Sequence, residues 1–168
     1  MKTWATGGVT LLIATPNSEG GTTLIACSGG IHASADTGRS WSGLGGPLAG
    51  VNTKALEALP HPGGGYTLFN GTEFDGVFVL DSDTRQWSKR NTGFINSNIE
   101  KLASGSDRSG KAILLAYASH CGGYVSADCA TSWTPEQRVR SSDMLTAFAA
   151  VDSVRLVSTY RGVFRSID

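Results

Sequence analysis

The chain has 168 residues, which suits a single domain, and its 14 basic and 14 acidic residues give a formal charge of zero. Without a basic block or stripe, the sequence argues against nucleic acid as a partner. No run reaches the roughly 18 apolar residues of a membrane span. The three cysteines, Cys27, Cys121 and Cys129, share no metal-ligand spacing, so we predict neither a bound metal nor a cofactor.

Glycine is abundant, with 22 residues, many of them in clusters such as Gly20-Gly21 and Gly122-Gly123. Glycine clusters between short apolar runs indicate many tight turns, which is the composition of an all-β protein. Near the N-terminus, the apolar stretch at residues 9–14 is short, and no small-x-small cleavage site follows it. We therefore assign this stretch to the fold and not to a secretory signal.

Along the chain, one unit of sequence recurs four times. Each copy opens with an apolar run, and these runs span residues 8–15, 53–60, 98–105 and 144–151. A second apolar run, a glycine, a third short run and a turn follow. The register is set by three glycines that each stand eleven residues before a tryptophan: Gly30, Gly76 and Gly122 before Trp41, Trp87 and Trp133.

A repeat of about 42 residues that holds four strands is the signature of a β-propeller blade. We predict an all-β fold, a β-propeller of four blades with four antiparallel strands each, at residues 5–41, 42–87, 88–133 and 134–168 with 1–8. The N-terminal strand would complete the last blade, within one chain or with a second chain, and so remove an exposed sheet edge. The rival fold, a β-sandwich with Greek-key turns, would not repeat one motif at a fixed register.

The turn before the tryptophan carries a short polar motif. Residues 34–41 read SADTGRSW, residues 126–133 read SADCATSW, and the chain ends with SID. Ser and Asp side chains can form hydrogen bonds with nearby backbone amides and organise such a turn. Gly38 can adopt a positive φ, and the tryptophan ring can pack on a neighbouring blade. In this interpretation Asp36 and Asp128 are structural acceptors; the alternative is that they bind a metal or act as bases.

This pattern resembles the Asp-box, also called the BNR repeat, of sialidases, sortilin-type receptors, xyloglucan-degrading propeller glycosidases and photosystem II assembly factors. The lead-ins GGYVSAD and GVFRSID look most like the last two groups. The resemblance covers nearly the whole chain and implies a propeller fold, but it leaves activity open. The positions that it implies to be structural are Ser34, Asp36, Gly38, Trp41, Asp83, Trp87, Ser126, Asp128, Trp133, Ser166, Asp168 and Trp4.

Two blades depart from the motif. In the second, residues 80–85 read LDSDTR where the box should lie, and in the third Ala130 replaces the glycine. Propellers with this motif have six or more blades, whereas this chain encodes four. The chain therefore closes a small ring alone, pairs with a second copy in an eight-bladed ring, or is a piece of a longer or engineered protein. We favour the second copy.

Ligands of propellers usually approach the face opposite these turns, which carries the links between second and third strands. The candidate ligand-binding residues on that face are Glu73, Phe74, Asp75, His120, Tyr160 and Arg161. Exposed aromatic rings with polar neighbours are compatible with binding a protein or a glycan. Glu73 and Asp75 could instead be a glycosidase acid pair, although residues two apart on one turn seldom have the required opposed geometry.

Other catalytic interpretations find less support. A sialidase needs three converging arginines, and the arginines here are scattered among turns. His120 beside Cys121 could suggest a cysteine nucleophile, but adjacent residues on a strand point to opposite faces. We therefore predict a non-enzymatic scaffold that binds a protein or a glycan and associates with itself. The alternative is a glycoside hydrolase, sialidase-like or of the propeller glycosidase type, or a fragment of one.

Overall fold

The structure is a computed structural model, and it describes residues 8–17, 19–46, 48, 50–61, 65–81, 85–107, 109–137, 139–140, 145–151, 154–159 and 161–167. Every regular element in this part of the chain is a β-strand. The strands form four separate antiparallel sheets, each built from strands that follow one another in sequence. The described residues contain no helix that could cross a membrane.

The first sheet contains β1 (Leu11–Pro16), β2 (Thr22–Cys27), β3 (Ile31–Ser34) and β4 (Ser42–Gly43). The second contains β5 (Thr53–Pro60), β6 (Tyr66–Thr72), β7 (Val77–Leu80) and β8 (Trp87–Lys89). The third contains β9 (Ile99–Ser106), β10 (Ala112–Ala118), β11 (Gly122–Ser126) and β12 (Thr134–Glu136). The fourth contains β13 (Leu145–Val151), β14 (Val154–Thr159) and β15 (Gly162–Ile167). The predicted all-β propeller architecture is confirmed.

The repeat places these strands because each apolar run becomes a strand. Of the glycine clusters, Gly20-Gly21 lies between β1 and β2 as predicted for a turn, whereas Gly122-Gly123 opens β11. The outermost strands are short, and β4 and β12 begin one residue after Trp41 and Trp133, so both sheets extend beyond those tryptophans. The fourth sheet has three strands among the described residues. The predicted outer strand from the N-terminus falls largely in residues 1–7, which lie outside the described residues.

The second and third sheets bury apolar side chains on both faces because each of them has a neighbouring sheet on either side. Along β10, every residue from Ile113 to Ala118 is buried. One apolar cluster joins the first and second sheets through residues such as Ile25, Leu68 and Trp87. A second cluster, which includes Phe69 and Tyr124, joins the second and third sheets. Burial on both faces explains why these runs do not alternate strictly between apolar and polar residues.

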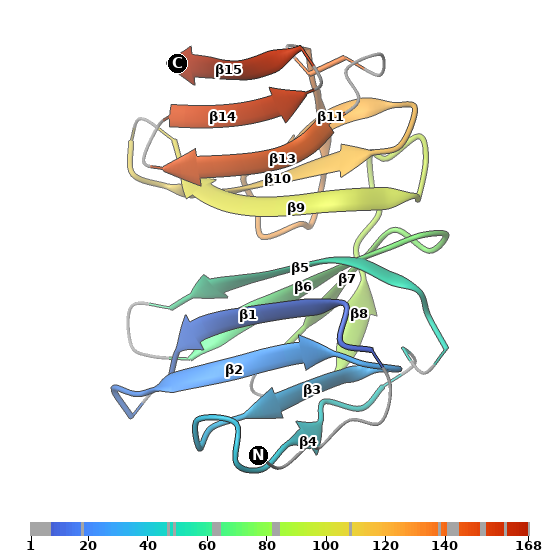
Figure 1. Cartoon of the computed structure of the whole chain (residues 1–168). Helices are drawn as coiled ribbons and strands as arrows, with labels where there is room; N and C mark the ends of the chain where they lie inside the picture. The colour runs from blue at the N-terminus through green and yellow to red at the C-terminus, as the bar shows by residue number, and fades with distance from the viewer. Residues whose placement is uncertain are drawn as a thin grey trace.

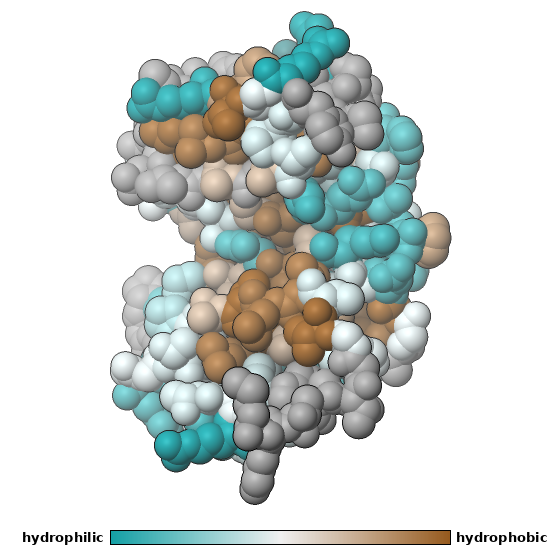
Figure 2. All heavy atoms as spheres, viewed as in Figure 1, coloured by the Kyte–Doolittle hydropathy of each residue, from teal (hydrophilic) through white to brown (hydrophobic). Residues whose placement is uncertain are grey.

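The four sheets follow one another in an open arc, from the first at the bottom of Figure 1 to the fourth at the top. Their innermost strands are neighbours in sequence order, with β1 beside β5, β5 beside β9, and β9 beside β13. The first and fourth sheets therefore lie at opposite ends of the series. Figure 2 shows, in the same view, that the surface is hollowed between the two halves of the arc.

Candidate functional site

The motif turns of the first and third sheets use their carboxylates as hydrogen-bond acceptors. Asp36 accepts hydrogen bonds from Ser40 Oγ at 2.6 Å, Ser40 N at 2.9 Å and Ser34 Oγ at 2.8 Å. Ser34 Oγ in turn accepts a hydrogen bond from Gly38 N at 2.9 Å. These donors, led by the Ser40 hydroxyl, hold the pKa of Asp36 well below its ordinary value.

Asp128 repeats this arrangement in the third sheet. It accepts hydrogen bonds from Ser132 Oγ at 2.6 Å, Ser132 N at 2.9 Å and Ser126 Oγ at 2.7 Å. The same donors lower the pKa of Asp128 to about 2, with the Ser132 hydroxyl as the largest cause. Ala130 adopts the left-handed conformation, with φ of 64°, at the position where the first turn has Gly38. The backbone conformation of the turn thus survives the loss of its glycine.

The tryptophans of the second and third sheets bind the linker that comes from the preceding sheet. Trp87 Nε1 donates to Leu44 O at 3.3 Å, and Trp133 Nε1 donates to Arg90 O at 3.0 Å. Trp41 Nε1 instead donates to Gly38 O within its own turn. Phe94, from the linker before β9, stacks on Trp133 with ring centroids 4.8 Å apart. The indole rings therefore anchor the segments that lead from one sheet to the next.

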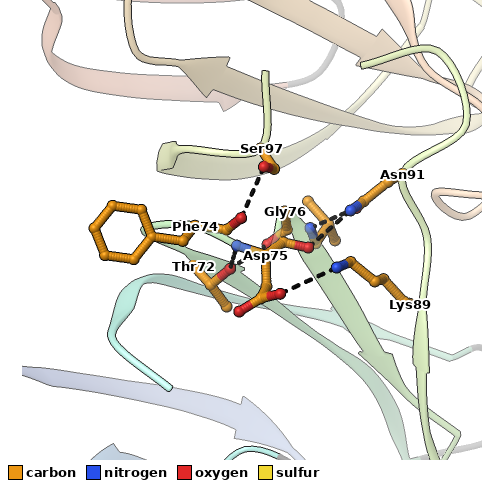
Figure 3. Close-up of polar contacts among 8 residues, drawn as sticks. Thr72, Phe74, Asp75, Gly76, Lys89, Asn91 and Ser97 are labelled. Atoms are coloured by element: carbon orange, nitrogen blue, oxygen red, sulfur yellow. Dashed lines mark hydrogen bonds and ion pairs between the residues drawn. The ribbon is translucent and has the colours of Figure 1, made fainter. Parts of the chain in front are cut away.

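On the face opposite the motif turns, the turn between β6 and β7 is held by a network of hydrogen bonds (Figure 3). Thr72 Oγ1, in a fully buried residue, donates to Gly76 O at 2.9 Å and accepts from Asp75 N at 3.0 Å. Asn91 Nδ2 donates to Asp75 O at 2.7 Å, and Ser97 Oγ donates to Phe74 O at 2.8 Å. Both the local chain and the following linker thus fix the backbone of this turn.

The side chain of Phe74 projects away from this network (Figure 3). It is 74% exposed although its backbone is fixed. Ile95, which the sequence interpretation did not single out, is 82% exposed and lies in the same linker as Ser97. The stretch GFINSN offered a signal, because Ile95 stands among the polar and turn-forming residues that flank Phe94. Phe74 and Ile95, called the apolar patch, are thus exposed apolar side chains on two segments that the hydrogen bond from Ser97 to Phe74 O joins.

The two acidic residues of the turn are each paired with a different lysine. Asp75 forms an ion pair with Lys89 at 3.1 Å, and Glu73 forms one with Lys54 at 3.5 Å. Glu73 also accepts a hydrogen bond from Asn52 Nδ2. The two carboxylates are thus held by separate partners on either side of Phe74, which is not the arrangement of an acid pair facing across a cleft.

The remaining predicted residues contribute unevenly to this face. His120 is exposed and adopts a φ of 61° in the turn between β10 and β11, next to Cys121, whose side chain packs against the core. Asn96 Nδ2 donates to Ser119 O at 3.0 Å, so the linker that carries Ile95 also touches the His120 turn. Arg161 is exposed in the turn between β14 and β15. Tyr160, Trp4, Asp83 and Asp168, and the side chain of Ser166, lie outside the described residues.

Cys121 occupies a different setting from the one expected. The sequence interpretation placed it on a strand, whereas β11 begins at Gly122 and Cys121 lies in the preceding turn. Cys121 N donates to Ala118 O, which closes that turn. The described residues contain no group of three His, Cys, Asp or Glu side chains that could hold a metal ion.

A cavity of about 330 Å³ lies between the first and second sheets, at the end that carries the motif turns. Its wall includes Thr23 and Leu44 from the first blade, and Tyr66, Leu80 and Arg85 from the second blade. Burial raises the pKa of the Tyr66 hydroxyl, and the Arg85 charge partly opposes this. Leu80 stands where the first and third blades have Ser34 and Ser126, so this cavity lies beside the blade whose turn lacks that serine.

No family model and no curated protein matches this sequence. Among solved structures, YCF48 bound to D1 peptide is similar over 100% of this chain and 52% of its own, with a TM-score of 0.62 and 14% identity. YCF48 from Cyanidioschyzon merolae matches 99% of this chain and 71% of its own, with a TM-score of 0.42 and 11% identity. The chain thus spans about half the length of the first structure. In fold, it is a β-propeller that resembles the photosystem II assembly factor YCF48.

Proposed function

We propose that the chain is a non-enzymatic module that binds a protein segment through the face formed by the 72–76 turn, the 91–98 linker and the 119–121 turn. The observation that carries this proposal is the exposed Phe74 side chain on a backbone that is fixed from several directions. Aromatic anchors of this kind dominate the binding energy of protein interfaces. A fixed backbone also lowers the entropic cost of binding, because little has to be ordered when the partner arrives.

The polar surroundings of Phe74 suit a peptide. Lys54, Glu73, Asp75 and Lys89 place charges of both signs around the apolar patch. An apolar centre with a polar rim is the common anatomy of a protein interface. The YCF48 structure that shares this fold contains a bound D1 peptide, which supports a peptide as the class of ligand.

A glycan and a hydrolase remain the competing interpretations, and the geometry favours them less. A sugar-binding face stacks aromatic rings on the ligand, whereas the second exposed apolar side chain proposed for this face, Ile95, is aliphatic. A retaining or inverting glycosidase needs two carboxyl groups flanking one bond. Glu73 and Asp75 are instead engaged with Lys54 and Lys89 on the surface.

A phage-displayed random-peptide library selected on the purified chain tests the proposal. Peptides enriched on the unmodified chain should bind Phe74→Ala at least about tenfold more weakly, the loss typical of an interface hot spot. Ile95→Ser should weaken them in the same direction. Val9→Ser, which also removes an exposed apolar side chain but from the segment before β1, serves as the matched control and should leave binding unchanged. The proposal is wrong if no peptide is enriched, or if the enriched peptides bind Phe74→Ala as well as the unmodified chain.

We also infer that a second copy of the chain is a partner, and that two copies complete an eight-bladed ring. The open arc of the four sheets supports this inference, because its two ends are far apart in the series.

A further inference from the structure

Because the sheets repeat one sequence pattern, equivalent residues in different sheets should be buried to a similar extent, and a residue that is much more exposed marks a missing neighbour. Leu12, Leu56 and Leu102 are equivalent residues on the innermost strands of the first three sheets. Each pairs with a residue of the second strand, and that residue pairs with one on the third strand that stands nine positions before a tryptophan: His32, Phe78 or Tyr124. Leu56 and Leu102 are 6% and 8% exposed, since each faces the preceding sheet. Leu12 is 62% exposed. This face of the first sheet, which points away from the second, is called the leading face below.

The other end of the arc shows the complementary deviation. Val163 stands three residues before Ser166, as Ile31 does before Ser34 and Val77 before Leu80. Ile31 and Val77 are 5% and 0% exposed, because each faces the following sheet. Val163 is 72% exposed. This face of the fourth sheet, which points away from the third, is called the trailing face below.

We propose that the leading face of one copy packs on the trailing face of a second copy, so that Leu12 and Val163 of different chains become buried. This rests on the proposed pairing of two chains and specifies its contact. The interfaces within the chain supply the template, because they already join one leading-type face to one trailing-type face. The pairing is head-to-tail, and with two copies both ends of each arc are covered in one closed ring.

A second copy fits these faces because one chain carries both halves of the contact. The half-buried Leu156 on β14 belongs to the trailing face, in the row where the other sheets have the fully buried Ile25, Phe69 and Leu115. Arg165 stands where the second sheet has Val79, and it is exposed. A long arginine side chain can cover apolar surface with its stem while its guanidinium reaches water at the rim. Leu156 and Val163 thus occupy on the trailing face the repeat positions that the inner sheets use at their own contacts.

Light scattering during size-exclusion chromatography measures the assembly directly. The unmodified chain should elute with twice the 17.5 kDa mass of one chain. Leu12→Asp and Val163→Asp should each shift the particle to the single-chain mass, because each places a charge in the contact. Ile95→Asp is the matched control, since Ile95 is 82% exposed but lies in the linker before β9, away from both contact faces, and this variant should keep the doubled mass. Circular dichroism checks that every variant retains its β-sheet spectrum.

Mixing the two variants distinguishes the head-to-tail contact from a symmetric one. In a head-to-tail pair of one Leu12→Asp chain and one Val163→Asp chain, one contact carries both changes and the other carries neither. The mixture should therefore recover a particle of doubled mass that neither variant forms alone. A symmetric pairing of like faces would leave a charge in both contacts and recover nothing. The proposal is overturned by a single-chain mass for the unmodified protein, by a doubled mass for Leu12→Asp or Val163→Asp, or by a mixture that stays at the single-chain mass. Peptide binding through Phe74 is read separately, so a failure there leaves this result interpretable.

Discussion

The polar side chains of the motif turns act locally, and the hydrogen bonds of Asp36 and Asp128 show how. Each carboxylate accepts from a serine four residues ahead in the chain through both the backbone amide and the hydroxyl. Each also accepts from a serine two residues behind. These donors favour the ionised carboxylate, so the turn is most stable when Asp36 and Asp128 are charged.

The acid response of Asp128 follows from its pKa. Folding lowers this pKa from an ordinary 3.8 to about 2, so the stabilisation is complete above about pH 4 and is lost as the pH falls toward 2. Asp128→Asn removes the titration and weakens the hydrogen bonds. We expect a lower Tm at pH 7 and a shallower loss of stability between pH 4 and pH 2 than in the unmodified chain.

Thermal unfolding at a series of pH values, which gives the Tm at each pH, measures this difference. Asp75→Asn is the matched control, because Asp75 forms a surface ion pair with Lys89 that typically contributes about 0–1 kcal/mol. It should change the Tm at pH 7 less than Asp128→Asn does. Identical acid-side slopes for Asp128→Asn and the unmodified chain would contradict the assigned role of this carboxylate.

Among the structural elements, the turn between β6 and β7 depends on one buried hydroxyl. Thr72→Val keeps the shape of the side chain but leaves Asp75 N without its acceptor in a partly buried position. Losing such a partner costs about 1–3 kcal/mol. We expect a loss of unfolding free energy in that range, faster amide exchange within residues 73–76, and weaker peptide binding although Phe74 is retained.

Hydrogen exchange read by mass spectrometry, together with urea unfolding, tests this prediction. Thr134→Val is the matched control, because Thr134 is exposed and its hydroxyl forms a long 3.3 Å bond to Val125 O. That variant should leave the exchange of residues 73–76 unchanged. Unchanged exchange in Thr72→Val would show that the linker alone holds the turn.

The strands could be predicted from the sequence because the repeat sets their register. The opening runs at 53–60 and 144–151 contain the whole of β5 and β13, because the same apolar run recurs at the same place in each copy of the repeat. The apolar patch could be predicted only in part. Phe74 follows from its exposed place in a turn, whereas Ile95 depends on contacts made by Ser97 and Asn96 with turns 23 residues away in sequence. Local patterns carry no information about such contacts.

At the scale of the whole molecule, the described residues form a series of similar interfaces, with the exposed side chains of Leu12 and Val163 at its two ends. Stability in such repeat structures is approximately a sum over units and their nearest-neighbour contacts. Leu12 and Val163 are the exposed residues at the two ends of the series, where one nearest-neighbour contact is missing from that sum. A second chain would supply both missing contacts at once, and the loop face with Phe74 would then occur twice around the ring.

Electron-microscopy class averages of the purified chain test this arrangement most directly. The account predicts closed rings of eight radial sheets around a central hub, each ring made of two chains. A compact particle without radial sheets, or rings of four sheets closed by one chain, would contradict it.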